Sequence, residues 1–162
     1  MSYRNGVVLT SFAAVAFGLA CHDSSGPSFP PDVQQMRNAV AAYASFERAQ
    51  QDGWGTAITD CMASAAGGMG IHYGNTALID GTVDPLRPEV LMYEPGSNGT
   101  LTFVGVEFIV PFSARPKDGP APQAFGRSFA PNDAFGVWAL HVWTTRTNPS
   151  GLFADWNPRV HC

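Results

Sequence analysis

The sequence predicts a single α+β domain, in which an N-terminal amphipathic helix packs on a small antiparallel sheet with long loops rich in proline and glycine. The chain has 162 residues, of which 45% are apolar, so one ordinary domain with a buried core can form. Its 17 glycines and 13 prolines indicate many turns and few long helices. One apolar stripe at helical spacing comes early, and apolar strand patterns follow it.

The charge of the chain excludes two classes of partner. Nine Lys and Arg residues stand against 13 Asp and Glu residues, which gives a net charge of −4. A nucleic-acid-binding domain carries a basic surface, and a membrane-surface protein carries clusters of Lys and Arg. We therefore expect no nucleic-acid partner and no polybasic contact with a membrane.

Residues 1–20 have the pattern of a secretory signal peptide. Arg4 supplies a positive end, an apolar stretch runs over 7–20, and small residues precede Cys21. This arrangement resembles a bacterial lipobox, although its commonest form has Leu where Gly18 stands. The resemblance implies cleavage after Ala20 and lipid on Cys21. Secretion without lipid and retention as an uncleaved anchor are the alternatives.

The predicted localisation is exported and membrane-anchored, on the periplasmic or cell-surface side. Residues 21–31 are rich in Ser, Gly and Pro and are expected to act as a tether for the globular domain, which covers 32–162. His22 follows the lipid-bearing position where Asp would favour the inner membrane. In a cell with two membranes, the usual sorting pattern then implies the outer one.

The three cysteines agree with export. If Cys21 carries lipid, Cys61 and Cys162 remain and are expected to form a disulfide in an oxidising compartment. Two unpaired buried thiols are the alternative.

The first part of the domain is predicted to be helical. An apolar stripe predicts a helix over 32–52 that ends at Gly53, and it consists of Val33, Met36, Val40, Tyr43 and Phe46. A second short helix is expected over 57–66. The glycines of 67–70 lack the residues of a phosphate-binding loop, so we expect them to allow close approach to a neighbouring element.

The rest of the domain is predicted to be a sheet with loops. Strands over 89–94 and 101–110 are expected to form a hairpin around the turn at 96–99. An exposed proline-rich loop is expected over 111–131. A further strand is predicted over 135–145, and the irregular tail over 148–162 should pack down onto the domain.

Three ionisable residues interrupt apolar strand patterns. Strict alternation places Glu107 on one face with Leu101, Phe103, Gly105 and Ile109. His141 is the ionisable member of the face formed by Phe135, Val137, Ala139 and Trp143. His72 lies between two large apolar residues. Because an isolated buried carboxylate is costly, we expect His72, Glu107 and His141 to converge on one partly buried pocket.

Two histidines and one carboxylate can perform several kinds of chemistry. They can hold a divalent metal, or the carboxylate can orient an imidazole for proton transfer. A structural ion pair is the alternative, because the spacing matches no known motif. Secondary candidates for the same pocket are Tyr73, Asn75, Glu94 and Trp143.

Three functions follow from these observations. The first is a membrane-tethered, extracytoplasmic binding or accessory domain for a small ligand, with its pocket around His72, Glu107 and His141. The second is a metal-dependent enzyme that uses these residues as ligands and Tyr73 or Glu94 as a proton carrier. The third is a structural envelope lipoprotein without a site. The sequence identifies no catalytic residue and no particular cofactor.

Several segments resemble a group of exported bacterial proteins whose function is uncharacterised. They are Gly70–Tyr73, Asn75–Gly81, Pro88–Pro95, Val106–Pro111, Leu140–Trp143 and Asn148–Pro158. The resemblance covers most of 40–162. It implies that the segments around His72, Glu107 and His141 and the stretch Asn148–Pro158 belong to one recurring design, and it implies no activity.

Overall fold

A computed structural model describes residue 1 and residues 28–162 of the chain. The signal peptide, Cys21 and most of the tether fall in 2–27 and lie outside the described residues. The described chain begins with helix α1 (Pro31–Ala39), the 3-10 turn η1 (Ala41–Ala44) and helix α2 (Phe46–Gln51). No helix in this part of the chain is both long and apolar enough to cross a membrane.

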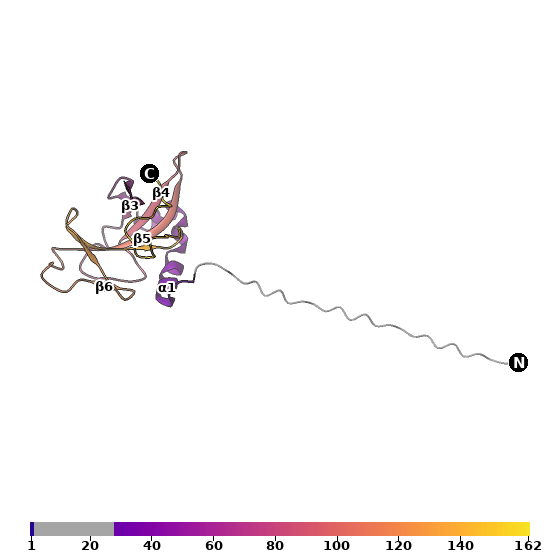
Figure 1. The fold of residues 1–162 in the computed structure, drawn as a ribbon, viewed down its shortest axis with the longest axis horizontal. Coiled ribbons are helices and arrows are strands. Elements are labelled where there is room, and N and C mark those ends of the chain that lie inside the picture. Colours follow the sequence, from indigo (N-terminus) through magenta and orange to yellow (C-terminus); the bar gives the residue numbers. More distant parts are fainter. Residues whose placement is uncertain (2–27) are drawn as a thin grey trace.

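The rest of the domain is built from antiparallel strands. They are β1 (Thr56–Ala57), β2 (Met62–Ser64), β3 (Gly67–Gly74), β4 (Val90–Pro95), β5 (Leu101–Pro111), β6 (Gln123–Ala124), β7 (Arg127–Ser128), β8 (Ala130–Asn132) and β9 (Val137–Trp143). Seven form one sheet, in the order β1-β3-β4-β5-β9-β8 with β2 also paired to β3. Strands β6 and β7 form a separate hairpin (Figure 1).

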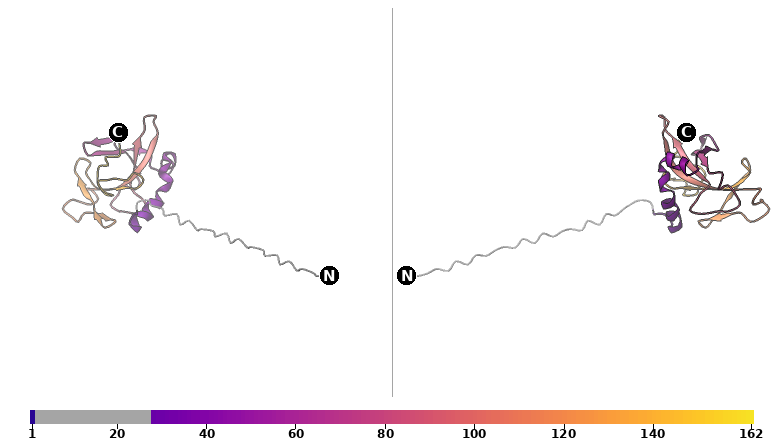
Figure 2. Two further views of the ribbon diagram at one scale, coloured as in Figure 1. Left: turned by 45° about the vertical axis from the view of Figure 1, so that its right-hand side comes forward. Right: turned by 180° about the vertical axis from the view of Figure 1, so that it is seen from behind.

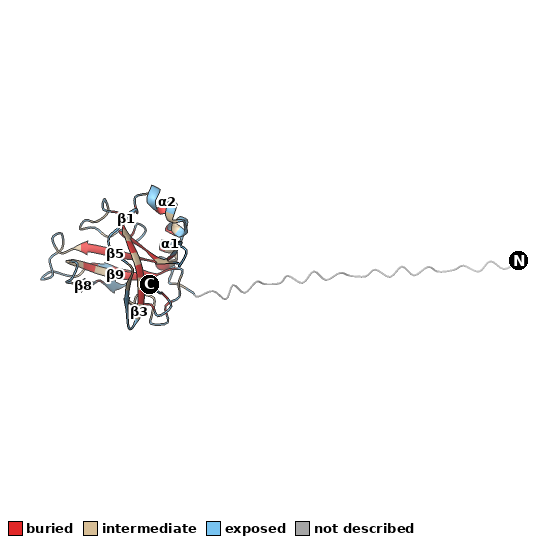
Figure 3. Cartoon of the chain, turned by 90° about the horizontal axis from the view of Figure 1, so that it is seen from above, coloured by how far each residue is buried: buried red, intermediate tan, exposed pale blue. Residues whose placement is uncertain are grey.

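The helices cover one face of the seven-stranded sheet. Val33 and Met36 of α1, and Val40 between α1 and η1, pack in the main core cluster with side chains of β4, β5 and β9. The two additional views show the helices gathered on one side of the sheet (Figure 2). Strands β5 and β9 are largely buried, whereas the outer side of the helices is exposed (Figure 3).

The C-terminal segment lies against the other face. Asn157 forms a backbone bridge with Gly68 of β3, and Val160 packs with Met92, Val104 and Trp143 in a second core cluster. The predicted packing of the tail is thus confirmed. The sheet is covered on both faces, which explains why its central strands are largely apolar on both faces.

Glycines in β3 allow this covering segment to come close, as predicted. A Cβ on Gly67 would lie 2.3 Å from the carbonyl oxygen of Asn157, and one on Gly68 would lie 2.6 Å from that of Val160. Larger residues at these positions would push the tail away from the sheet.

The prediction of one continuous helix over 32–52 is wrong. Ser45 has an extended backbone, and its side-chain oxygen accepts a hydrogen bond from the Arg48 amide. This N-cap begins α2 as a separate helix after η1, because a capping side chain satisfies the first amides of a new helix.

The helix predicted over 57–66 is also wrong. Residues 56–57 and 62–64 instead form β1 and β2, which pair with the two ends of β3. The run of small residues has good helix propensity, but pairing with an available strand edge outweighs such weak local preferences. Cys61 therefore lies in the connection between two short strands.

The predicted hairpin and last strand are confirmed as β4–β5 and β9, with shifted ends.

The predicted exposed loop over 111–131 is only partly open. It contains the β6–β7 hairpin, and its Ala124 and Phe129 belong to the main core. Aromatic side chains in this loop explain its packing, since Phe125 and Phe129 both contact Phe108 of β5.

The face assignment along β5 requires one correction. The register shifts between Met92 and Tyr93 of β4, so that Gly105 pairs with Met92 and Phe103 pairs with Tyr93. Phe103 consequently packs in the helix-side cluster, and Val104 packs on the face of Met92 and Trp143. Because of the bulge, the side chains that precede Gly105 point to the faces opposite to those that strict alternation predicts.

Candidate metal centre

The three predicted residues come from three strands of the sheet. Glu107 of β5 pairs directly with His141 of β9, and His72 of β3 pairs with Met92 of β4. Because Met92 pairs in turn with Gly105, two residues before Glu107, all three side chains project from the face that the C-terminal segment covers. The helices lie on the opposite face.

The structure brings the three side chains together. His72 Nε2 lies 3.7 Å from Glu107 Oε2, and His141 Nε2 lies 3.5 Å from Glu107 Oε1. The two imidazole Nε2 atoms are 3.4 Å apart. Within the described residues this group offers one ligand atom from each side chain, with all three atoms inside 4.8 Å of one another.

The three side chains are shielded from solvent. His72 is 3% exposed and Glu107 9%, and His141 is 5% exposed. The Trp143 ring lies nearly parallel to the His141 ring and forms one wall. The negative charge of the carboxylate in such a buried cluster has to be neutralised by protons or by a cation.

Each histidine is held from outside by a second polar group. His72 Nδ1 lies 2.9 Å from the Thr59 hydroxyl, and His141 Nδ1 lies 3.3 Å from the Asp155 carboxylate. Both Nε2 atoms therefore point inward, while both Nδ1 atoms have partners on segments outside the sheet strands. Metal-binding histidines show this arrangement, because an Nδ1–H bond fixes the tautomer that directs the Nε2 lone pair to the ion.

Burial and neighbouring charges shift the pKa values of the three groups. Burial and the nearby charge of His141 lower the pKa of His72 to about 3, so its imidazole is neutral at physiological pH. Burial raises the pKa of Glu107, against the opposing effect of His141. Burial alone would lower the pKa of His141, but the charge of Glu107 and the hydrogen bond to Asp155 raise it.

A divalent cation balances these charges. The hydrogen bond to His141 lowers the pKa of Asp155 and so favours its anionic form. The two positive charges of a divalent ion would match the carboxylates of Glu107 and Asp155. The donor set of two imidazoles and one carboxylate suits zinc and other first-row transition metals.

The interatomic distances also fit an ion better than a hydrogen-bonded pair. Nitrogen ligands at 2.0–2.1 Å from a tetrahedral zinc ion lie about 3.4 Å apart. The separation between the two Nε2 atoms is 3.4 Å and matches this value. The separations of 3.7 and 3.5 Å from His72 and His141 end on different oxygens of Glu107, and one ligand atom from each residue lies within 4.8 Å of the others. Hydrogen bonds of a closed structural pair would normally be 2.7–3.2 Å long.

Of the secondary candidates, only Trp143 contributes to this cluster. Tyr73 packs on the helix-side face against Phe46 and Tyr93. Asn75 donates to the Asp52 carbonyl and accepts from the Ala77 amide, which anchors a turn.

Glu94 also serves elsewhere. Its carboxylate binds the Arg146 guanidinium and the His161 amide near the end of the chain. Because Tyr73 packs on the opposite face and Glu94 is bound by these partners, the structure supports neither as a proton carrier for the triad.

Sequence reasoning missed two residues that contact the histidines, and one buried carboxyl group elsewhere. Thr59 and Asp155 contact the histidines across 13 and 14 residues of sequence, and no local pattern marks either one. Asp155 lies within one of the segments that carry the family resemblance, which was the one available signal. Glu89 is buried beside a cavity of about 410 Å³ that Asp80 and Asp84 also line.

Comparison of the chain with known proteins adds no family. No protein-family model, no curated protein and no solved structure matches it significantly.

Proposed function

We propose that this chain is an exported, membrane-tethered domain that binds one divalent transition-metal ion, with zinc as the best fit, through His72, Glu107 and His141. The observation that carries the proposal is the 3.4 Å spacing of two buried imidazole nitrogens beside the Glu107 carboxylate, with both imidazoles oriented from outside by Thr59 and Asp155. A structural ion pair would need neither this spacing nor both outer partners.

Burial favours binding over catalysis. A catalytic zinc site keeps a coordination position open to water and substrate. Here the three ligand side chains are at most 9% exposed, and the C-terminal segment lies over the same face of the sheet. The domain is therefore suited to retaining an ion, and metal-dependent catalysis is the second candidate function.

The disulfide supports the exported location. Cys61 and Cys162 are bonded, as predicted, with their Cα atoms 5.5 Å apart. Structural disulfides persist in oxidising compartments outside the cytoplasm. The lipid anchor on Cys21 belongs to this proposal, and intact-mass analysis of membrane fractions should find a chain that begins at Cys21 and carries acyl groups.

The metal proposal is tested by elemental analysis and titration. The protein purified from its exported compartment should contain one zinc equivalent per chain, or take up one after chelation. Saturation at 100 times the dissociation constant should stabilise the fold by about 2.7 kcal/mol. His161→Asn is the matched control, since His161 is exposed and outside the triad, and it should keep the ion. His72→Asn should lose it.

Two results would refute this function. One is the absence of stoichiometric metal together with no thermal shift for zinc, cobalt, nickel or copper. The other is equal metal uptake by His72→Asn and the parent chain, which would place the ion elsewhere.

A further inference from the structure

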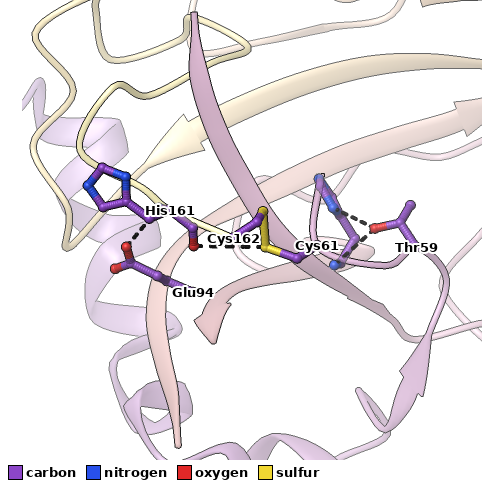
Figure 4. Close-up of a disulfide and its surroundings, with 6 residues drawn as sticks. Thr59, Cys61, Glu94, His161 and Cys162 are labelled. Atoms are coloured by element: carbon purple, nitrogen blue, oxygen red, sulfur yellow. Dashed lines mark hydrogen bonds between the residues drawn. A yellow bond between two sulfur atoms is a disulfide. The ribbon is translucent and has the colours of Figure 1, made fainter. Parts of the chain in front are cut away.

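The disulfide joins the two chain segments that hold the histidines from outside. Thr59 lies shortly before Cys61 in the connection between β1 and β2. Asp155 lies in the C-terminal segment that ends at Cys162. The close-up shows the sulfur–sulfur bond between Thr59 on one side and the contact of Glu94 with His161 on the other (Figure 4).

Hydrogen bonds to His72 hold the first half of the Thr59 connection to the sheet. The Ile58 amide donates to the His72 carbonyl, and the His72 amide donates to the Thr59 hydroxyl. Asp60 and Cys61 form no strand, and β2 begins directly after them at Met62. The bond to Cys162 adds a covalent restraint two residues after Thr59, whose hydroxyl contacts His72 Nδ1.

The tail is held by more contacts than this connection. Asn157 and Gly68 exchange two backbone hydrogen bonds of 3.0 Å, and the Trp143 indole donates to the Ala154 carbonyl. The tail thus acts as the fixed partner, and the disulfide anchors the Thr59 connection to it. Loss of the bond should loosen the Thr59 side of the site before the Asp155 side.

The disulfide is accessible although the metal ligands are not. Cys162 is exposed and Cys61 is half-buried, whereas the triad is shielded on the same face. A thiol reagent can therefore reach the sulfurs without opening the metal centre.

We propose that this disulfide couples metal retention to the redox state of the compartment, so that its reduction releases the ion. This inference rests on the proposed metal-binding function. The reductant is a dithiol: one thiolate attacks a sulfur of the bridge to form a mixed disulfide, and the second thiol resolves it. Two electrons pass to the protein, Cys61 and Cys162 become thiols, and the dithiol becomes a disulfide.

Coupling of this kind is reciprocal. If the bridge raises the affinity of the ion by a given factor, the ion must make the bridge harder to reduce by the same factor. Outer partners of metal ligands are typically worth about 10–100-fold in metal affinity, which sets the size expected when Thr59 is loosened.

The experiment compares zinc affinity in the two redox states of the full chain. Zinc is titrated against a competing chelator, first with the oxidised protein and then after phosphine reduction, with the thiols alkylated and the reagents removed. We expect a 10- to 100-fold weaker affinity after reduction. The variant Cys61→Ser/Cys162→Ser should match the reduced protein and should not respond to phosphine.

A second measurement needs no variant. The parent chain is equilibrated in a series of glutathione redox buffers, with and without a saturating concentration of free zinc, and the fraction of disulfide is counted by acid quenching, alkylation and mass. Bound metal should shift the equilibrium toward the disulfide by the same factor as the affinity change.

Each outcome decides the inference. Equal affinity in both redox states, within about twofold, would overturn the coupling and leave metal binding intact. Metal loss that occurs only with loss of the near-ultraviolet circular dichroism of the fold would overturn it as well, because general unfolding would then explain release. An oxidised chain that binds no metal would instead refute the proposed function itself.

Discussion

His72 Nε2 and His141 Nε2 lie 3.4 Å apart, although the two histidines belong to strands that are not neighbours in the sheet. Strands β4 and β5 separate β3 from β9, so both imidazoles must lean across the face to meet. Two buried ring nitrogens at this distance repel one another unless a proton or a cation lies between them. Glu107, which projects from the intervening β5, adds a carboxylate at the same point.

The first prediction concerns this carboxylate. Glu107→Gln keeps the size of the side chain and removes its charge, so zinc affinity should fall by about 100-fold or more, beyond the usual effect of an outer partner. The free energy of unfolding of the metal-free protein should fall by clearly less than the about 3–5 kcal/mol that loss of one half of a buried ion pair costs. Chelator competition and urea unfolding measure the two quantities.

The opposite pattern would contradict the metal centre. If Glu107 were one half of a structural ion pair, its replacement would leave a buried partner charge and cost about 3–5 kcal/mol of stability. Zinc affinity would then be the same in the variant and in the parent chain.

The second prediction concerns the outer partner of His141. Asp155→Asn retains an oxygen that can accept from Nδ1–H, but it removes a negative charge that offsets the ion, so zinc affinity should fall about 10-fold. Asp155 is 62% exposed, so the fold itself should be little affected. Asp133→Asn is the matched control, since Asp133 is 72% exposed and pairs with Lys117 away from the site. Equal affinity in both variants would exclude a role for Asp155.

The central part of the site could be predicted from the sequence. Glu107 and His141 each stand alone among apolar residues of a strand, and the cost of burying isolated charges implies that such residues find one another. The disulfide could be predicted by elimination, because two cysteines remain once Cys21 is assigned to lipid.

The outer parts of the site could not be predicted in this way. Thr59 lies in a stretch of small residues that favours a helix by local propensity, and its place is set by pairing with β3. Asp155 lies in an irregular, polar tail, where no periodicity predicts which way its side chain points. The bulge before Gly105 likewise reverses the faces of Phe103 and Val104, because it depends on the partner strand.

The third prediction concerns Gly105, which lies next to the bulge. A Cβ on Gly105 would lie 2.7 Å from the Val142 carbonyl oxygen and 2.8 Å from the Met92 methyl group. Since the carbonyl belongs to the paired strand and cannot move freely, Gly105→Ala should destabilise the fold by about 1–3 kcal/mol. Gly119→Ala is the control, because its nearest contact would be an ordinary 3.5 Å. Urea unfolding that shows equal stability for the two variants would contradict the close pairing of β5 with β9.

The last prediction concerns the pH dependence of stability that Glu89 causes. Burial raises the pKa of Glu89 to about 7, with Asp80 and Asp84 adding to the shift, while the Ile109 amide donates to its carboxylate. In the unfolded chain the pKa of the same group is near its ordinary value of 4.5. Between these two pH values the folded protein holds a proton that the unfolded chain has lost.

Stability should therefore fall as pH rises from about 4.5 to about 7, and this contribution should be level outside that window. One pKa unit corresponds to about 1.4 kcal/mol, so the full loss should be about 3 kcal/mol. Glu89→Gln keeps an oxygen that can accept from the Ile109 amide and cannot ionise, so its unfolding free energy should lack this slope. The variant should be more stable than the parent chain at pH 8 and closely similar at pH 4. Parallel slopes for the two proteins across the window would show that Glu89 is ionised in the folded state throughout.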